Sequence, residues 1–203
     1  MANLQRPPQG DDGRICNVGP KREATVEDLY HVEEDGPAEL VNGEIVLMGP
    51  VCHAHAYASG EIFASLHAYG KTTRRGHPTP DSTAFIVDLP NRRSFCPDVA
   101  FHVGRSFGRR FIEGAPVFAV EIRSPEDYGP AAERRLAAKR ADYFAAGTLV
   151  VWDVDVLREG FVRVYRATDA LTPTRYRRGD RAEAEPAVPG WSMPVGDLFV
   201  TSE

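Results

Sequence analysis

The chain has 203 residues, of which 42% are hydrophobic and 26% charged, and its formal net charge is −5. This composition excludes an intrinsically disordered protein and is sufficient for one buried core, so we expect a single domain over residues 21–203. Residues 1–20 are rich in Pro, Gly, Asp and Asn, and we expect a disordered or poorly ordered tail there. The acidic charge also excludes a broad basic field, which argues against tight binding of naked DNA.

No apolar run reaches the roughly 18 residues of a membrane-spanning helix, and the N-terminal region lacks the apolar segment of a signal peptide. Three cysteines, Cys16, Cys52 and Cys96, are scattered without a C-x-x-C pair. A reducing compartment is the natural setting for such thiols. We therefore expect a cytoplasmic protein without membrane contact.

The elements that the patterns predict are, in chain order, a short helix near 25–32, a hairpin through 39–48, a long helix from about 53 to 70, strands near 83–89, 98–103 and 117–121, a helix over 130–146, a strand over 149–154 and its hairpin partner over 161–166. A helix between two apolar strands supplies the crossover of a mixed sheet. The sequence therefore predicts an α/β fold with a mixed β-sheet flanked by helices.

Two acids occupy neighbouring strands of this predicted sheet. Asp98 follows Pro97, and Glu121 lies inside the apolar run 117–122. A buried carboxylate needs a cation, a metal or a proton, so something must compensate Glu121. Two carboxylates, a backbone carbonyl and waters suit Mg²⁺ or Mn²⁺ better than zinc. The alternative is structural: Asp98 caps a turn and Glu121 pairs with an arginine.

Lys139 is directed toward the core side of the predicted helix over 130–146. It stands three residues after Leu136 and four before Tyr143, which belong to the apolar stripe of that helix. An inward lysine beside Glu121 can pair with a carboxylate or stabilise charge on a phosphate and an attacking water. The alternative is a snorkelling lysine with its amine in water.

Several motifs in order resemble one bacterial family. They are AELVNGEIVLMGPVCHAHAYASGEIFASLHAY, PDVAF, FAVEIRSPED, KRADYFAAGTLVVWDVD, FVRVYRA and VPGWSMPVGDLF. This series resembles the Uma-two family, which is classed as restriction endonuclease-like, and the likeness extends over roughly residues 22–200. The resemblance implies a restriction endonuclease-like core of the PD-(D/E)XK nuclease superfamily.

The resemblance also implies site residues. Asp98, Glu121 and the backbone carbonyl of Ile122 are expected to hold the metal. The superfamily's lysine, two residues after the second acid, is replaced here by Arg123, and Lys139 matches the lysine that this family carries on the following helix. Arg123 could instead clamp a phosphate. Glu44 matches the acid from the N-terminal region, although Asn42-Gly43 is a turn signal and Glu44 could simply flank a hairpin.

Other polar residues are better explained by structural roles. His53 and His55 form a His-x-His pair at the start of the second predicted helix, with no accompanying Cys/His cluster, so hydrogen bonding at the helix start is the preferred interpretation, although His55 matches a histidine of the family. Asp153 and Asp155 end a strand, where acids leading into a turn are common.

The expected function is a metal-dependent endonuclease that hydrolyses DNA phosphodiester bonds with Mg²⁺ or Mn²⁺, using Asp98, Glu121, Lys139 and Glu44. We expect DNA to bind weakly, and a homodimer is left open. The alternative is a catalytically inactive nuclease-fold protein with a binding or regulatory role. Arg123 and the acidic net charge support that alternative, whereas the intact set of Asp98, Glu121 and Lys139 favours the enzyme.

Overall fold

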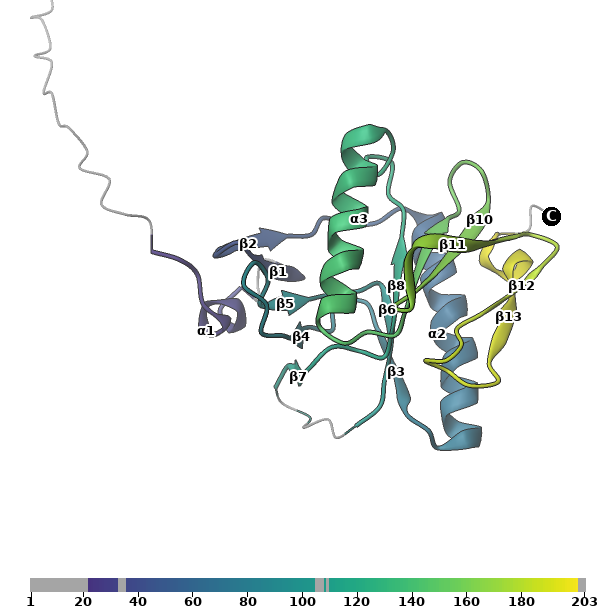
Figure 1. Cartoon of the computed structure of the whole chain (residues 1–203), viewed down its shortest axis with the longest axis horizontal. Helices are drawn as coiled ribbons and strands as arrows, with labels where there is room; N and C mark the ends of the chain where they lie inside the picture. Colours follow the sequence, from purple (N-terminus) through teal and green to yellow (C-terminus); the bar gives the residue numbers. More distant parts are fainter. Residues whose placement is uncertain (1–21, 33–35, 105–107, 109, 201–203) are drawn as a thin grey trace, which may run out of the picture.

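A six-stranded mixed sheet forms the centre of the molecule, as seen in a computed structural model (Figure 1). The structure describes residues 22–32, 36–104, 108 and 110–200. The sheet has the strand order β11-β10-β9-β8-β6-β3, in which β8 and β9 are parallel and the other neighbours are antiparallel. The expected tail over residues 1–20 lies outside the described residues.

The helices are α1 (Val26–Tyr30), α2 (His53–Thr73) and α3 (Pro130–Ala145), followed by a 3-10 turn at Val195–Leu198. The strands of the central sheet are β3 (His77–Pro80), β6 (Val99–His102), β8 (Phe118–Ile122), β9 (Val150–Asp155), β10 (Phe161–Arg166) and β11 (Asp169–Arg177). Smaller sheets contain β1 (Ala38–Val41) with β2 (Glu44–Leu47), β5 (Ser94–Phe95) with β4 (Phe85–Ile86) and β7 (Ile112–Glu113), and β12 (Arg181–Glu183) with β13 (Ser192–Pro194). Within the described ranges, no helix is long and apolar enough to cross a membrane.

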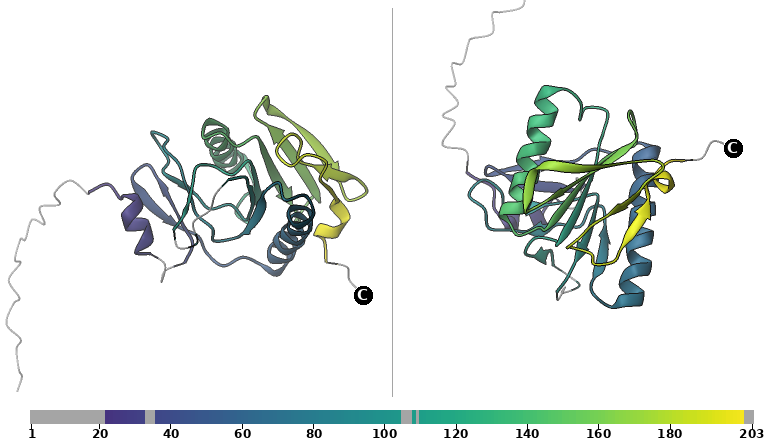
Figure 2. Two further views of the ribbon diagram at one scale, coloured as in Figure 1. Left: turned by 90° about the horizontal axis from the view of Figure 1, so that it is seen from below. Right: turned by 45° about the vertical axis from the view of Figure 1, so that its right-hand side comes forward.

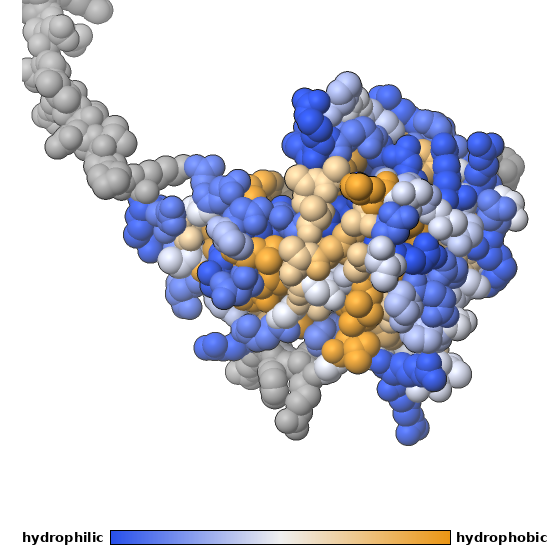
Figure 3. All heavy atoms as spheres, viewed as in Figure 1, coloured by the Kyte–Doolittle hydropathy of each residue, from blue (hydrophilic) through white to orange (hydrophobic). Residues whose placement is uncertain are grey.

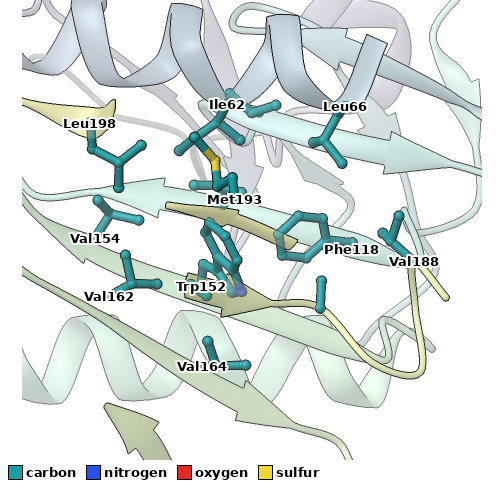
Figure 4. Close-up of a cluster of buried hydrophobic side chains, with 14 of the residues drawn as sticks. Ile62, Leu66, Phe118, Trp152, Val154, Val162, Val164, Val188, Met193 and Leu198 are labelled. Atoms are coloured by element: carbon teal, nitrogen blue, oxygen red, sulfur yellow. The ribbon is translucent and has the colours of Figure 1, made fainter. Parts of the chain in front are cut away.

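One face of the central sheet is covered by α2 and the C-terminal segment. Side chains alternate along a strand, so Phe118, Val120 and Ile122 of β8 share this face and join the main hydrophobic cluster. Helix α2 contributes Ile62 and Leu66 to the same cluster, and Figure 4 shows them opposite the aromatic rings of the sheet. One side of β8 is therefore packed in the main hydrophobic cluster, and polar groups can lie only on its other side.

The opposite face of the sheet is covered by α3, the crossover helix between β8 and β9. The two views of Figure 2 agree that α2 and α3 lie on opposite sides of the sheet. Tyr143 of α3 is fully buried and stacks on Phe95, with 3.9 Å between ring centroids. The small Ala119 of β8 lies in this cluster, and its next neighbour on the same face is Glu121. Helix α3 thus closes over the strand residue whose carboxylate most needs a partner.

The β1–β2 hairpin is anchored beside the central sheet through β5 and its flanking loop. The backbone N–H of Leu40 donates to Oγ of Ser94 at 2.8 Å, and the N–H of Arg93 donates to the carbonyl of Leu40 at 2.9 Å. Leu40 itself is fully buried. These contacts fix the position of its neighbour Glu39, which becomes important in the site.

The expected α/β fold is confirmed, and the principal helices and the apolar strands lie close to their expected positions. Two strands of the sheet were missed for a shared reason: they contain proline and lie at its edges. Strand β3 has the sequence His77-Pro78-Thr79-Pro80, and the mostly exposed β11 contains Pro173. Proline lacks an N–H donor and is tolerated mainly on edge strands, so local patterns underpredict such strands.

Replacing Leu66 with Ala should lower the free energy of unfolding by about 2 to 5 kcal/mol, because the fully buried side chain leaves a cavity between α2 and the sheet. The neighbouring His67 is exposed, so His67→Ala should change the stability by less than about 0.5 kcal/mol. Chemical denaturation of both variants measures the difference. Equal effects at the two positions would contradict the orientation of α2.

Candidate active site

Asp98 and Glu121 lie on the same face of the sheet, at the adjoining ends of β6 and β8. Val99 pairs with Val120 in the antiparallel register, so the preceding Asp98 lies opposite Glu121. Oδ2 of Asp98 accepts a hydrogen bond from the N–H of Ile122 at 2.6 Å. Both carboxylates line one cleft. The two acids that the sequence singled out are therefore brought together.

Lys139 reaches from α3 into the same cleft. Its Nζ atom lies 2.7 Å from Oε2 of Glu121 and 2.9 Å from Oε1 of Glu39. The hydroxyl of Tyr143, one helical turn further along α3, donates to the other oxygen of Glu121 at 2.7 Å. Although burial acts against the charge on Lys139, the two carboxylates outweigh it and raise the pKa of the amine. Lys139 is thus a fixed positive charge and not a solvent-directed lysine.

Glu39 is a site residue that the sequence analysis did not identify. Its carboxylate is almost fully buried and accepts hydrogen bonds from Arg92 at 2.5 Å and from the N–H of Cys96 at 3.0 Å. Burial alone would raise the pKa of Glu39, but Lys139 and Arg92 overcome it and hold the pKa below its usual value. Glu39 lies between apolar residues in the buried stretch Ala38–Leu40, so the argument used for Glu121 could have marked it as a buried acid, although not as a partner of Lys139.

The placement of Glu44 corrects the expected role of that residue. Glu44 is the first residue of β2, next to the Asn42-Gly43 turn, and it is exposed. It is not among the residues that line the cleft, whereas Glu39 of the adjacent strand is. Glu39 pairs with Val46 and Glu44 with Val41, so both glutamates lie on the same face of the hairpin, but Glu44 lies two residues closer to the turn than Val46, the first residue of β2 that lines the cleft. The N-terminal acid of this cleft is Glu39.

His55 is also part of the cleft. It lies in the first turn of α2, is only 3% exposed, and its Nε2 atom is 3.0 Å from Oδ1 of Asp98. The distance is that of an ion pair, although the ring N–H is not aligned for a hydrogen bond. Burial lowers the pKa of His55, but Asp98, Asp81 and Glu121 outweigh it and raise the pKa. His53 is exposed, so only one histidine of the pair reaches the site.

The cleft has a volume of about 450 Å³ and is lined by both charged and apolar residues. The charged and titratable groups at its floor are Glu39, His55, Asp81, Asp98, Glu121 and Lys139. On the rim, Val46, Leu47 and Val51 are about half exposed, and Glu126, Asp127 and Arg135 also line the cleft. Six acids thus face one lysine, one arginine and one histidine across a small volume, and the cleft carries an excess of negative charge.

The excess of negative charge affects Glu121. Burial, with Asp98 and Glu39 nearby, raises the pKa of Glu121 to about 7 against the pull of Lys139. A carboxyl group whose pKa is raised this far is ionised at neutral pH only at a cost in free energy. An additional cation near Glu121 would remove part of that cost.

The donor set fits Mg²⁺ or Mn²⁺ in kind. Carboxylate oxygens are the ligands that these hard cations prefer, and Asp98 and Glu121 each use two hydrogen-bond or ion-pair contacts of about four acceptor positions. The side chains are not yet gathered around a point, because no group of three or more His, Cys, Asp or Glu side chains among the described residues is close enough to hold a metal. An ion held by Asp98 and Glu121 would therefore need backbone or water oxygens as its remaining ligands.

Arg123 does not serve as a phosphate clamp. Its guanidinium is bidentate to Asp153 at 2.6 and 2.7 Å and to Glu133 at 2.6 and 3.1 Å, and it is only 3% exposed. These bonds engage the fork of donors that a phosphate would need. Asp155 is likewise structural, since it accepts the N–H groups of residues 157–159. The acids at the end of β9 therefore hold the fold together, as preferred from the sequence.

Comparisons with known proteins identify the family and the fold of the chain. Residues 24–196 match the sequence profile of the Uma2 (Uma-two) family, which is described as "Putative restriction endonuclease". Among solved structures, the fold is similar to that of a "putative nuclease belonging to DUF820" from Anabaena variabilis ATCC 29413, with a TM-score of 0.67 and 17% identity over 84% of this chain and 96% of that chain. No curated protein matches the chain. The structural likeness identifies a restriction endonuclease-like α/β fold.

Replacing Glu121 with Gln should stabilise the metal-free protein at about pH 8 by about 1 to 3 kcal/mol. The pKa of Glu121 lies above its ordinary value of 4.5, so the folded state favours the protonated form and loses stability as the pH rises from 4.5 to about 7. Gln cannot ionise and avoids that loss, while Lys139 keeps Glu39 as a partner. Denaturation of wild type and variant in EDTA at several pH values measures the effect. A variant that is less stable at high pH would identify Glu121 as an ordinary ion-pair partner.

Replacing Arg123 with Met should lower the free energy of unfolding by about 3 to 5 kcal/mol, because the buried Asp153 loses its strongest cationic partner. Arg93 pairs with Asp88 at the surface and is half exposed, so Arg93→Met should cost at most about 1 kcal/mol. Thermal or chemical denaturation compares the two. A small loss of stability in Arg123→Met would contradict the structural role of Arg123 and favour phosphate binding instead.

Proposed function

Since the chain belongs to the Uma2 family of restriction endonuclease-like proteins, we propose that it is a metal-dependent endonuclease that hydrolyses phosphodiester bonds in DNA. The observation that carries the proposal is the cleft in which Asp98 and Glu121 adjoin Lys139 on one face of the sheet. Oxygen ligands together with a fixed amine are the groups that metal-assisted phosphodiester hydrolysis requires.

Asp98, Glu121 and the backbone carbonyl of Ile122 would hold Mg²⁺ or Mn²⁺. The bound ion would lower the pKa of a coordinated water and neutralise charge on the phosphate. Lys139 would orient the attacking water or stabilise a non-bridging phosphate oxygen, since its amine is already held at the floor of the cleft by two carboxylates. Glu39 would keep Lys139 in position when Glu121 turns toward the ion.

His55 has a positioning role in this proposal. Its ring fixes one oxygen of Asp98, and the N–H of Ile122 fixes the other. A carboxylate held at both oxygens has little freedom to rotate, which favours a defined ligand geometry. His55 would release part of this hold when a cation binds Asp98.

A second candidate function is a nuclease-fold protein that binds without turnover. The observation in its favour is that Asp98, Glu121 and Glu39 already have partners in His55 and Lys139. Such a protein would need no metal. The two candidates therefore differ first in metal affinity and only then in activity.

Isothermal calorimetry with Mg²⁺ and Mn²⁺ should show binding to the wild type and loss of binding in Asp98→Asn, because the amide removes the charge of one ligand. Metal-dependent cleavage of plasmid and single-stranded DNA should fall by at least about a hundredfold in the same variant. Asp88→Asn is the matched control, since Asp88 is an exposed acid outside the cleft. If the wild type binds neither ion, the binding protein becomes the better assignment.

A further inference from the structure

A row of charged residues runs from the cleft across the sheet and ends in two arginines. The registers of adjacent strands align Glu121 of β8 with Asp153 of β9, Asp153 with Arg163 of β10, and Arg163 with Arg175 of β11. Aligned residues share one face, so both arginines lie on the side that carries the cleft. In the view of Figure 3, the surface over β10 and β11 is predominantly hydrophilic.

Aromatic rings hold several of these arginines in place. Arg163 and Arg175 both lie over the ring of Phe161, at 4.3 and 4.2 Å from its centroid. Arg178, just beyond the end of β11, lies 3.6 Å over Phe199 of the main hydrophobic cluster, at the edge of the sheet. A guanidinium stacked on a ring is oriented through its flat face, and the N–H donors at its edge stay available for an anion.

Acidic groups neutralise this surface only in part. Glu159 pairs with Arg175 at 2.6 Å, and Asp153 and Glu133 are bound mainly by Arg123. Within the described residues, the side chains of Arg177 and Arg178 form no ion pair, and together with Arg175 they line a hollow of about 370 Å³. A chain of net charge −5 thus retains a local concentration of uncompensated arginines.

The arginines lie a short distance from the cleft. Three strand spacings of about 4.8 Å place Arg175 about 14 Å from Glu121, which corresponds to about four base steps of a nucleic-acid strand at 3.4 Å per step. The loop between β8 and α3 lies on this path: Ser124 and Asp127 line the cleft, while the adjacent Tyr128 carries Arg158 at 3.7 Å from its ring. Arg158 and Arg163 therefore lie along this path, Arg163 beside Asp153 and Glu133, before it reaches Arg175.

We propose that Arg163, Arg175, Arg177 and Arg178 form a second contact surface that binds the phosphate backbone of a nucleic-acid strand whose scissile phosphate lies in the cleft. The inference rests on the proposed endonuclease function for the identity of the partner. The arginine surface also explains how a chain of negative net charge could bind an anionic substrate. Binding affinity would come from this surface, and phosphodiester hydrolysis would occur in the cleft. Contacts to phosphates carry no base information, so the surface would bind without sequence preference.

The test measures binding of a short fluorescein-labelled DNA, as duplex and as single strand, in EDTA so that no cleavage occurs. The variant Arg177→Gln/Arg178→Gln is compared with Lys71→Gln/Arg75→Gln, which has the same net charge but is altered at the far end of α2, about 30 Å from the helix end that meets the cleft. The slope of log affinity against log salt concentration should decrease in magnitude by about 1 to 2 in the first variant and stay at the wild-type value in the second.

Equal decreases in both variants would assign the effect to net charge and overturn the proposal, as would an unchanged slope in Arg177→Gln/Arg178→Gln or an absence of DNA binding by the wild type. Binding to anionic phospholipid vesicles without binding to DNA would also overturn it. Thermal melting verifies that both variants fold. Asp88→Asn, at an exposed acid outside the cleft and the arginine surface, should bind DNA with the wild-type slope. If DNA binding depends on the arginines but no metal-dependent cleavage occurs, the endonuclease fails and this surface stands.

Discussion

The ion pairs of Lys139 with Glu121 and Glu39 are the interaction on which the site depends. An amine and two carboxylates are withdrawn from water here, and their mutual attraction offsets part of the cost of burying them. The three groups come from α3, β8 and the β1–β2 hairpin, so their mutual attraction ties the crossover helix, the central sheet and the N-terminal hairpin together. The same contacts keep an amine beside the acids that would hold a metal.

Because side chains alternate along a strand, the central sheet carries core residues on one face and the residues of the cleft on the other. On β8, Phe118, Val120 and Ile122 supply the core under α2, while Glu121 projects to the opposite face under α3. A shift of register by one residue would bury the acid among aromatic rings and expose the core residues. The main apolar cluster therefore fixes the direction of the functional carboxylate without touching it.

Arg123 and Lys139 use their positive charges near Glu121 in different ways. Arg123 stands two residues after Glu121 and is consumed by Asp153 and Glu133, which fasten β9 and the start of α3 to β8. Lys139 brings its amine to Glu121 from one face of α3. A bidentate guanidinium suits a rigid structural bridge, whereas a flexible amine suits a site that must adjust to a ligand.

The sequence by itself determined the fold class, the principal strands and helices, and the acids Asp98 and Glu121, because apolar strands, helix propensity and a carboxylate inside an apolar run are local signals. Lys139 was also available from helical spacing. Tertiary structure alone decided that Glu39 and not Glu44 enters the cleft, that His55 adjoins Asp98, and that Arg123 is saturated. Each of these depends on which elements dock together and in which register. A residue's neighbours in the sequence do not specify which residues of other elements it contacts.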